Sequence, residues 1–145
     1  MRAQCVAING VQSETQYMIS GVPQGSVLGP LLFIIYINDM GDIFPNSAAS
    51  KYFADGAKLY TEVVTGSDID DLQFSLDLLA EWAAAWQLSI SFNKCSTIDI
   101  AQRKQVGAFC ENNIEGNMLE NKSEVTDLGI KFDNGLSFLS YYSNC

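Results

Sequence analysis

Carboxylates are the residues of this chain whose type and placement could do chemistry. The sequence has 17 acidic residues, 8 basic residues and no histidine, which gives a net charge of −9. Without histidine, imidazole general bases and His-ligated zinc sites are excluded. The many carboxylates leave hard cations such as Mg²⁺ as possible partners. One carboxylate stands out, because Asp55-Gly56 lies between the strand-like segments 51–54 and 57–60. This pattern predicts a β-hairpin with a type I′ turn, which would fix the carboxylate at the end of two strands.

The segment that must hold a second candidate site is the loop at residues 20–26, Ser-Gly-Val-Pro-Gln-Gly-Ser. Its glycines and proline predict an irregular loop. An apolar helix is expected directly after it, over residues 28–40, because Pro30 is tolerated in a first helical turn. Before it, residues 6–8 and 15–19 are strand-like and flank Asn9-Gly10, which predicts another hairpin.

The next predicted element is a long amphipathic helix. Ser67 and Asp70 form a capping-box type of helix start. Apolar residues then recur at helical spacing and predict one buried face; they are Ile69, Leu72, Leu76, Leu79, Ala83 and Trp86. Strands are predicted at 96–100 and 124–132, followed by a turn at 133–135 and a short terminal element at 136–142. The expected fold class is α+β, with a mainly antiparallel sheet and helices packed on one face.

Composition limits the setting in which the chain works. A length of 145 residues suits one domain with one core. A pI near 4.2 argues against strong nucleic-acid binding by this chain alone, since phosphate contacts need clustered Lys and Arg. The four scattered cysteines suggest reduced thiols, with pairing as the alternative. No signal peptide or apolar run of membrane-spanning length is seen, so an intracellular location, cytoplasmic or nuclear, is expected.

Several segments together resemble a known family. Residues 20–33 resemble the Pro-Gln-Gly motif of reverse transcriptases, most closely that of non-LTR (LINE-type) retrotransposons. Residues 52–60, Tyr-Phe-Ala-Asp-Gly-Ala-Lys-Leu-Tyr, resemble the family's Phe-Ala-Asp-Asp turn. Residues 72–88, with two tryptophans, resemble the helix after that turn. Two further matches follow in the family's order, Lys94-Cys95 and the Leu-Gly strand at 125–130. The resemblance implies a partial palm domain over 1–145, with the core motifs in 1–105 and primer-grip-like strands and the start of a thumb in 106–145.

The resemblance also implies an activity and a set of partners. The family is an RNA-directed DNA polymerase that uses an RNA template, a DNA primer and dNTPs, with Mg²⁺ or Mn²⁺ in a two-metal mechanism. It implies that Asp55 is the catalytic and metal-binding residue. Lys94 matches a lysine proposed to protonate pyrophosphate. The resemblance implies nucleotide or template binding by five residues, Pro23, Gln24, Gly25, Phe53 and Ala54. It implies that Leu128 and Gly129 belong to the primer grip.

The sequence departs from the family pattern at the turn. Gly56 takes the place of the second Asp, and the strand with the first catalytic Asp is expected before residue 1. We therefore expect a truncated copy that does not polymerise DNA alone. The alternative from another class is a non-catalytic remnant that binds a partner through exposed sheet edges.

Each of these residues also has a structural interpretation. Asp55-Gly56 could be an ordinary turn, and the Pro23–Gly25 loop could serve only as a helix entry. Lys94 could be a solvated surface lysine. Trp82 and Trp86 are expected in the core, with base stacking as the alternative. Asp68, Asp70 and Asp71 are interpreted as helix N-terminal charges that the dipole favours.

Overall fold

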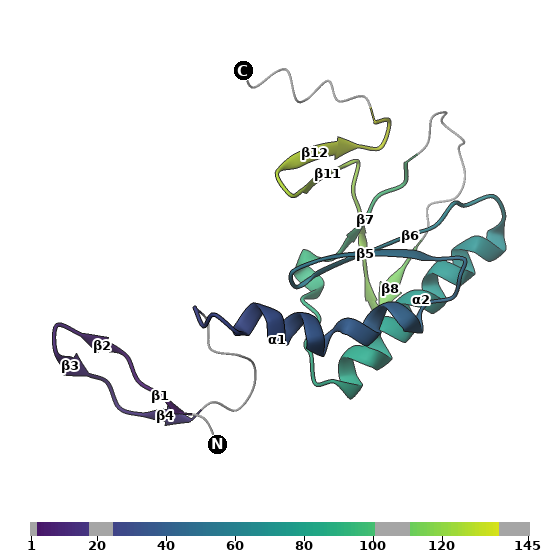
Figure 1. Cartoon of the computed structure of the whole chain (residues 1–145). Coiled ribbons are helices and arrows are strands. Elements are labelled where there is room, and N and C mark those ends of the chain that lie inside the picture. The colour runs from purple at the N-terminus through teal and green to yellow at the C-terminus, as the bar shows by residue number, and fades with distance from the viewer. Residues whose placement is uncertain (1–2, 18–24, 101–110, 137–145) are drawn as a thin grey trace, which may run out of the picture. The chain divides into compact units, whose positions relative to one another are not determined.

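The computed structural model describes residues 3–17, 25–100 and 111–136 (Figure 1). It divides the chain into two compact units, Met1–Asp39 and Met40–Cys145. The expected single domain over 1–145, with its subdivision at 105, stays a prediction.

The first unit begins with the predicted hairpin. Asn9 and Gly10 both have positive φ, +50° and +81°, which is the pattern of a type I′ turn. This turn joins the inner pair of strands, and a second short pair continues the hairpin. The prediction of a hairpin at Asn9-Gly10 is confirmed, and its strands are β1 (Ala3–Gln4), β2 (Ala7–Ile8), β3 (Val11–Gln12) and β4 (Gln16–Tyr17).

The predicted helix over 28–40 is two helices. Helix α1 spans Gly29–Tyr36 with Pro30 in its first turn, as expected. Helix α1 is capped at Ile37, and a 3₁₀ helix, η1, follows directly over Asn38–Ile43. Although α1 is apolar all round, most of its side chains are exposed; those of Leu31, Leu32, Ile34 and Ile35 are between 47% and 63% exposed.

The second unit contains the long amphipathic helix. Helix α2 spans Gly66–Ala85 and begins with a capping box, but at Thr65 and Asp68. The predicted start at Ser67 and Asp70 is therefore wrong by two residues. The carboxylate of Asp68 accepts hydrogen bonds from the backbone N–H groups of Thr65 (2.6 Å) and Val64 (2.9 Å). The interpretation of Asp68 as a helix N-terminal charge is confirmed.

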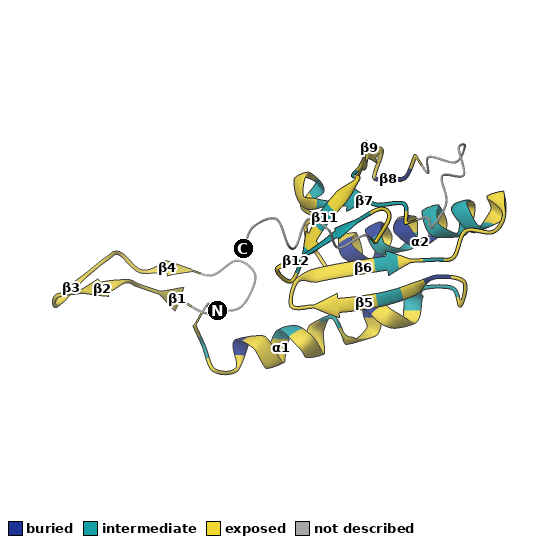
Figure 2. Ribbon diagram, turned by 90° about the horizontal axis from the view of Figure 1, so that it is seen from above, coloured by how far each residue is buried: buried dark blue, intermediate teal, exposed yellow. Residues whose placement is uncertain are grey.

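Helix α2 provides the core of this unit, as the dark residues in Figure 2 show. Leu76 and Ala80 are buried together with Ile114. Trp82 is also buried, whereas Trp86 is 40% exposed, so the predicted apolar face is correct at Leu76 and Ala83 and wrong at Trp86. Side chains that pack against this core are partly buried; they are Leu59, Ile90, Phe92, Cys95 and Leu119.

A side-chain amide joins α2 to the strand at 113–114. Gln73 accepts the N–H of Asn113 (2.9 Å) and donates to its carbonyl (3.0 Å). The amide thus takes the place of a neighbouring strand at that residue, because it satisfies both backbone groups.

The strands of the second unit form two-stranded pairs. Strands β5 (Ala49–Phe53) and β6 (Gly56–Tyr60) pair antiparallel, as predicted for the Asp55 region. The strand predicted at 96–100 is shorter, and the strand predicted at 124–132 is a hairpin that turns at Leu128-Gly129. The other elements are η2 (Phe92–Lys94), β7 (Ser96–Thr97), β8 (Asn113–Ile114), β9 (Asn117–Met118), β10 (Glu120–Asn121), β11 (Glu124–Asp127) and β12 (Ile130–Asp133).

The fold class is α+β, as expected, with one departure. In the described part of the chain the strands form six two-stranded sheets and not one broad sheet. Five pairs are antiparallel, and β7 pairs with β10 in parallel. The turn at Asn134-Gly135 is confirmed, whereas the terminal element at 136–142 lies almost wholly outside the described residues. None of the described helices combines the length and apolar character needed to cross a membrane.

Candidate functional site

The turn between β5 and β6 is built differently from the prediction. Phe53 pairs with Gly56, so the two-residue loop is Ala54-Asp55 and not Asp55-Gly56. Ala54 has φ +51°, whereas Asp55 and Gly56 lie outside the left-handed region. A positive φ at the first loop residue alone is the pattern of a type II′ turn. The predicted type I′ turn is therefore wrong by one residue.

The physical reason for this error lies in the strand pattern. Both registers place the same side chains on the same face, so the apolar pattern does not choose between them and only turn preference favours Asp-Gly. In the structure the hydroxyl of Thr61 donates to the carbonyl of Ser47 (2.8 Å). This bond fastens the open end of the hairpin in the observed register.

Two backbone features at the turn bear on chemistry. Ala54 adopts a conformation that costs an L-residue about 1 kcal/mol and that a type II′ turn normally gives to glycine. Gly56, in contrast, does not need to be glycine. A Cβ built on Gly56 would lie 3.3 Å from the backbone carbonyl oxygen of Phe53, a tight contact that requires a shift of a few tenths of an ångström. The φ of Gly56 is thus compatible with an aspartate, whose Cβ would need that shift.

The two faces of the β5–β6 hairpin differ. Leu59 packs on the core formed by Leu76, Ala80 and Ile114. Because side chains alternate along a strand, Lys58 and Gly56 belong to the opposite face, together with their cross-strand partners Lys51 and Phe53. Phe53 is 61% exposed, and Ala54 and Asp55 are exposed as well. The turn thus presents Phe53, Ala54 and Asp55 to solvent.

An ion pair connects this hairpin to the predicted primer-grip segment. Lys58 on β6 pairs with Asp127, the last residue of β11. The next two residues, Leu128 (φ +49°) and Gly129 (φ +84°), form an exposed type I′ turn. They lie in a turn and not in the predicted strand, because β11 ends at Asp127 and pairs back with β12. Sequence reasoning missed Lys58 and Asp127, since neither has a local signal at a separation of 69 residues.

The other predicted site residues are placed as follows. Gly25 has φ +80°, so its backbone requires glycine, while Pro23 and Gln24 lie outside the described residues. Lys94 is the exposed last residue of η2. Among the described residues, neither Asp55 nor Lys94 takes part in an ion pair. A cleft shared by the Gly25 loop and the Asp55 turn stays a prediction, since the two belong to different units.

The donor set at the turn does not fit a pair of divalent cations. In the described segments no group of three or more His, Cys, Asp or Glu residues is placed to hold a metal ion. Asp55 brings one exposed carboxylate, and its neighbour Gly56 brings none. Mg²⁺ is usually held by one or two carboxylates together with substrate phosphates, and a two-cation centre needs more oxygen donors than Asp55 offers.

Two titratable groups in the described segments have shifted pKa values. Hydrogen bonds from the backbone of Thr65 and Val64 lower the pKa of Asp68 below the ordinary 3.8. Burial raises the pKa of the Cys95 thiol, whose Sγ donates to the carbonyl of Ser91 (3.4 Å). Cys95 and the exposed Cys5 are free thiols. Neither shifted group belongs to the turn between β5 and β6.

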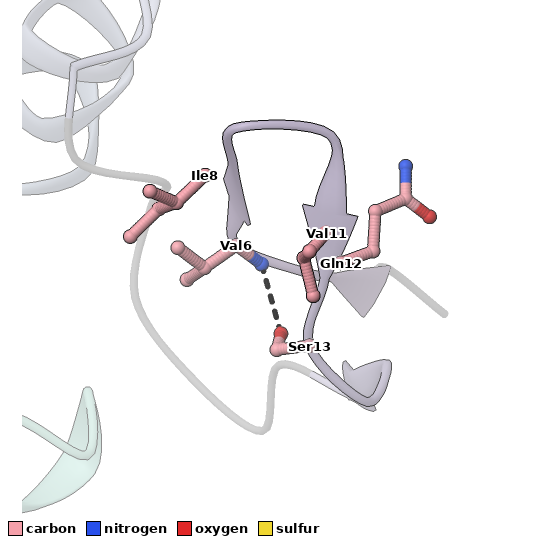
Figure 3. A pocket seen from close by; sticks show the side chains of 5 residues that line it. All are labelled: Val6, Ile8, Val11, Gln12 and Ser13. Carbon is pink, nitrogen blue, oxygen red and sulfur yellow. Dashed lines mark hydrogen bonds between the residues drawn. The ribbon is translucent and has the colours of Figure 1, made fainter.

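A shallow hollow in the first unit offers no chemistry. It lies on the N-terminal hairpin, where the N–H of Val6 donates to the hydroxyl of Ser13 (2.9 Å; Figure 3). Its lining has no ionisable side chain and consists of Val6, Ile8, Val11, Gln12 and Ser13.

Comparison with known proteins adds independent information. The family model described as reverse transcriptase (RNA-dependent DNA polymerase) matches residues 1–132. The RNA-directed DNA polymerase from mobile element jockey of Drosophila funebris is 36% identical over 92% of this chain. The jockey polymerase of Drosophila melanogaster is 29% identical over 96% of it. A probable RNA-directed DNA polymerase from transposon BS of Drosophila melanogaster is 34% identical over 92% of it.

The match is long in this chain but short in the relatives. The chain spans 15% of the Drosophila funebris protein and 16% of the other two. No solved structure is significantly similar to this chain.

Proposed function

This chain belongs to the reverse transcriptase family, and from that premise we propose that it is part of the palm of an RNA-directed DNA polymerase of a non-LTR retrotransposon. The family model covers residues 1–132. We further propose that this copy does not extend a primer by itself. The activity, substrates and partners of the intact polymerase are part of this proposal.

The observation that carries the proposal is the pairing of Phe53 with Gly56. It places Asp55 in the loop and residue 56 directly beside it, at the start of β6. In the family pattern both positions are Asp. Here the φ of residue 56 does not require glycine, although a Cβ there would lie 3.3 Å from the carbonyl oxygen of Phe53. The φ angles of the turn therefore do not by themselves demand glycine at the position that lacks the carboxylate.

The chain's own residues have distinct proposed roles around the intact reaction, in which a primer 3′-hydroxyl attacks the α-phosphate of a dNTP and pyrophosphate leaves. Phe53 and Ala54 line the exposed turn where the primer end and nucleotide would lie. The glycine at residue 25 allows backbone to approach the nucleotide or template base closely. We propose the Leu128-Gly129 turn as a primer-grip element, and Lys94 as a proton donor to the leaving group.

Mg²⁺ or Mn²⁺ belongs to the proposed intact reaction and not to this copy as it stands. A cation bound to Asp55 alone would keep most of its water ligands, because one carboxylate replaces few of them. The net charge of −9 also opposes the binding of an RNA template and a DNA primer by this chain alone.

Primer extension tests the proposal directly. The purified chain is mixed with a DNA primer annealed to an RNA template, dNTPs and Mg²⁺, and the products are separated by length. We expect the primer to stay at its original length, while a complete, active reverse transcriptase extends it under the same conditions. Extension by this chain would contradict the inactivity proposal.

A second candidate function is non-catalytic binding of a partner. The observation that favours it is α1, whose Leu31, Leu32, Ile34 and Ile35 are exposed although the helix is apolar all round. Helices of this type are normally buried. Size-exclusion chromatography with light scattering measures the oligomeric state. If the apolar surface of α1 binds other chains, we expect oligomers; if it does not, we expect a monomer.

A further inference from the structure

We propose that the ion pair between Lys58 and Asp127 is a positioning contact, which holds the Leu128-Gly129 turn beside the hairpin that carries Asp55. This inference rests on the proposed function for its meaning but not for its test. Lys58 lies on β6 and follows Asp55 closely in the sequence, and Asp127 directly precedes Leu128. The pair thus joins the bases of two turns that are far apart in the sequence.

Repulsion within its own hairpin favours the pairing of Lys58 with a carboxylate outside that hairpin. The register places Lys58 directly opposite Lys51 on the adjacent strand. Like charges at opposite positions of an antiparallel pair repel each other. The Asp127 carboxylate offsets this repulsion from outside, and the ammonium of Lys58 donates a hydrogen bond to it.

The pair differs from the other ion pairs of the described residues in what it connects. Lys131 pairs with Glu124 across the β11–β12 hairpin, and Lys122 pairs with Glu120 two residues away. Both are local. The Lys58–Asp127 pair joins two hairpins that share no backbone ladder, since β6 pairs with β5 and β11 with β12. Breaking it should therefore change the relation of the two hairpins and leave each hairpin formed.

The exposure of the pair sets the size of the effect. The Lys58 side chain is 44% exposed and that of Asp127 is 32% exposed, so water and salt screen the attraction. Exposed ion pairs of this kind shift an equilibrium by roughly 1.5- to fivefold. The contact is thus weak, and its loss should raise the fraction of molecules with separated hairpins, relative to docked ones, by that factor.

Distances between spin labels test this inference without metal, nucleotide or nucleic acid. The native cysteines are replaced, and nitroxides are attached to Glu62→Cys and Asn134→Cys, two exposed positions beyond the ends of β6 and β12. Double electron–electron resonance then gives the distribution of distances between the hairpins. We expect one dominant distance in the parent chain. In Lys58→Ala or Asp127→Ala, the separated population should rise by about 1.5- to fivefold relative to the docked one.

A double variant and a local control complete the test. Lys58→Ala/Asp127→Ala should raise the separated population no further than either single variant, because each single change already breaks the pair. Lys131→Ala removes the ion pair within the β11–β12 hairpin and should leave the distribution unchanged. Unchanged distances in both single alanine variants would overturn the inference, and so would additive effects in the double variant. Because no polymerase function enters the readout, failure here differs from failure of the proposed function.

Discussion

Phe53 and Gly56 face each other across the first rung of the β5–β6 ladder, with Ala54 and Asp55 as the two loop residues between them. The turn departs from an ordinary hairpin in two ways, a positive φ at a residue other than glycine and a missing carboxylate, and this register assigns them to different residues. The position with positive φ is Ala54 and not Gly56; the φ of Gly56 does not require glycine, although a Cβ there would lie close to the carbonyl oxygen of Phe53. Strained residues often occur at functional sites.

Replacing Ala54 by glycine tests the strain at the turn. Because Ala54 has φ +51°, Ala54→Gly should relieve a strain of about 1 kcal/mol, of which the greater flexibility of unfolded glycine offsets about 0.5–1 kcal/mol. The net stabilisation should therefore be about 0–0.5 kcal/mol, and urea unfolding followed by circular dichroism measures it. Ala57→Gly, on the neighbouring strand, is the matched control and should destabilise the chain by about 0.5–1 kcal/mol. Destabilisation by Ala54→Gly would show that the turn is not strained as described.

The core of the second unit depends on Leu76. This side chain is 8% exposed and packs with Ala80 and Ile114. Leu76→Ala should lower the free energy of unfolding by about 2–5 kcal/mol, through lost burial and the cavity left behind. Phe74→Ala, on the same helix but 53% exposed, should have a much smaller effect. Equal losses in urea unfolding would place the core elsewhere.

Asp68 should make stability depend on pH in the acid range. Its folded pKa is lowered from 3.8 by hydrogen bonds from Thr65 and Val64, so its stabilisation is present above 3.8 and is lost as the pH falls through the folded pKa. Asp68→Asn should therefore lower the midpoint of thermal unfolding at neutral pH, and the difference from the parent chain should shrink at pH values below 3.8. Asp70→Asn removes the same charge from an exposed neighbouring position. A difference that stays constant with pH would contradict the role of the Asp68 carboxylate.

The two free cysteines of the described segments should react at different rates. Burial raises the pKa of Cys95 and packs it against the core, whereas Cys5 is exposed. Alkylation proceeds through the thiolate, so Cys95 should be modified more slowly than Cys5 in the folded chain. Mass spectrometry of peptides after timed exposure to iodoacetamide measures both rates. Unfolding in urea is the control, since it should make the rates similar.

The sequence predicts local features of this fold better than their registers. The type I′ turn at Asn9-Gly10 and the long amphipathic helix α2 are confirmed, because turn residues and helical spacing determine them locally. The helix start is wrong by two residues, since Thr65 and Ser67 both offer a capping hydroxyl. The strand predicted at 124–132 is correct in its two halves but misses the turn at Leu128-Gly129, because Leu-Gly is not one of the residue pairs that favour a type I′ turn.

The register of the candidate site differs from the prediction, and the roles of its residues stay predictions. Asp55, Phe53 and Ala54 are at the exposed end of a hairpin, as the pattern indicates. The exact register depends on contacts that one sequence does not display, such as the bond between Thr61 and Ser47. The ion pair of Lys58 and Asp127 depends on the folded arrangement of distant segments, so no local motif indicates it.

Cation binding by Gly56→Asp tests the central claim most directly. Mn²⁺ is titrated into the parent chain and the variant, and free Mn²⁺ is followed by electron paramagnetic resonance. Gly66→Asp is the matched control, because it adds the same charge at a glycine with open space around it. If the turn is a former cation centre that lacks one carboxylate, Gly56→Asp should bind Mn²⁺ about tenfold more tightly than either the parent chain or Gly66→Asp. Asp55→Asn should remove that gain, and equal affinities in Gly56→Asp and Gly66→Asp would contradict the account.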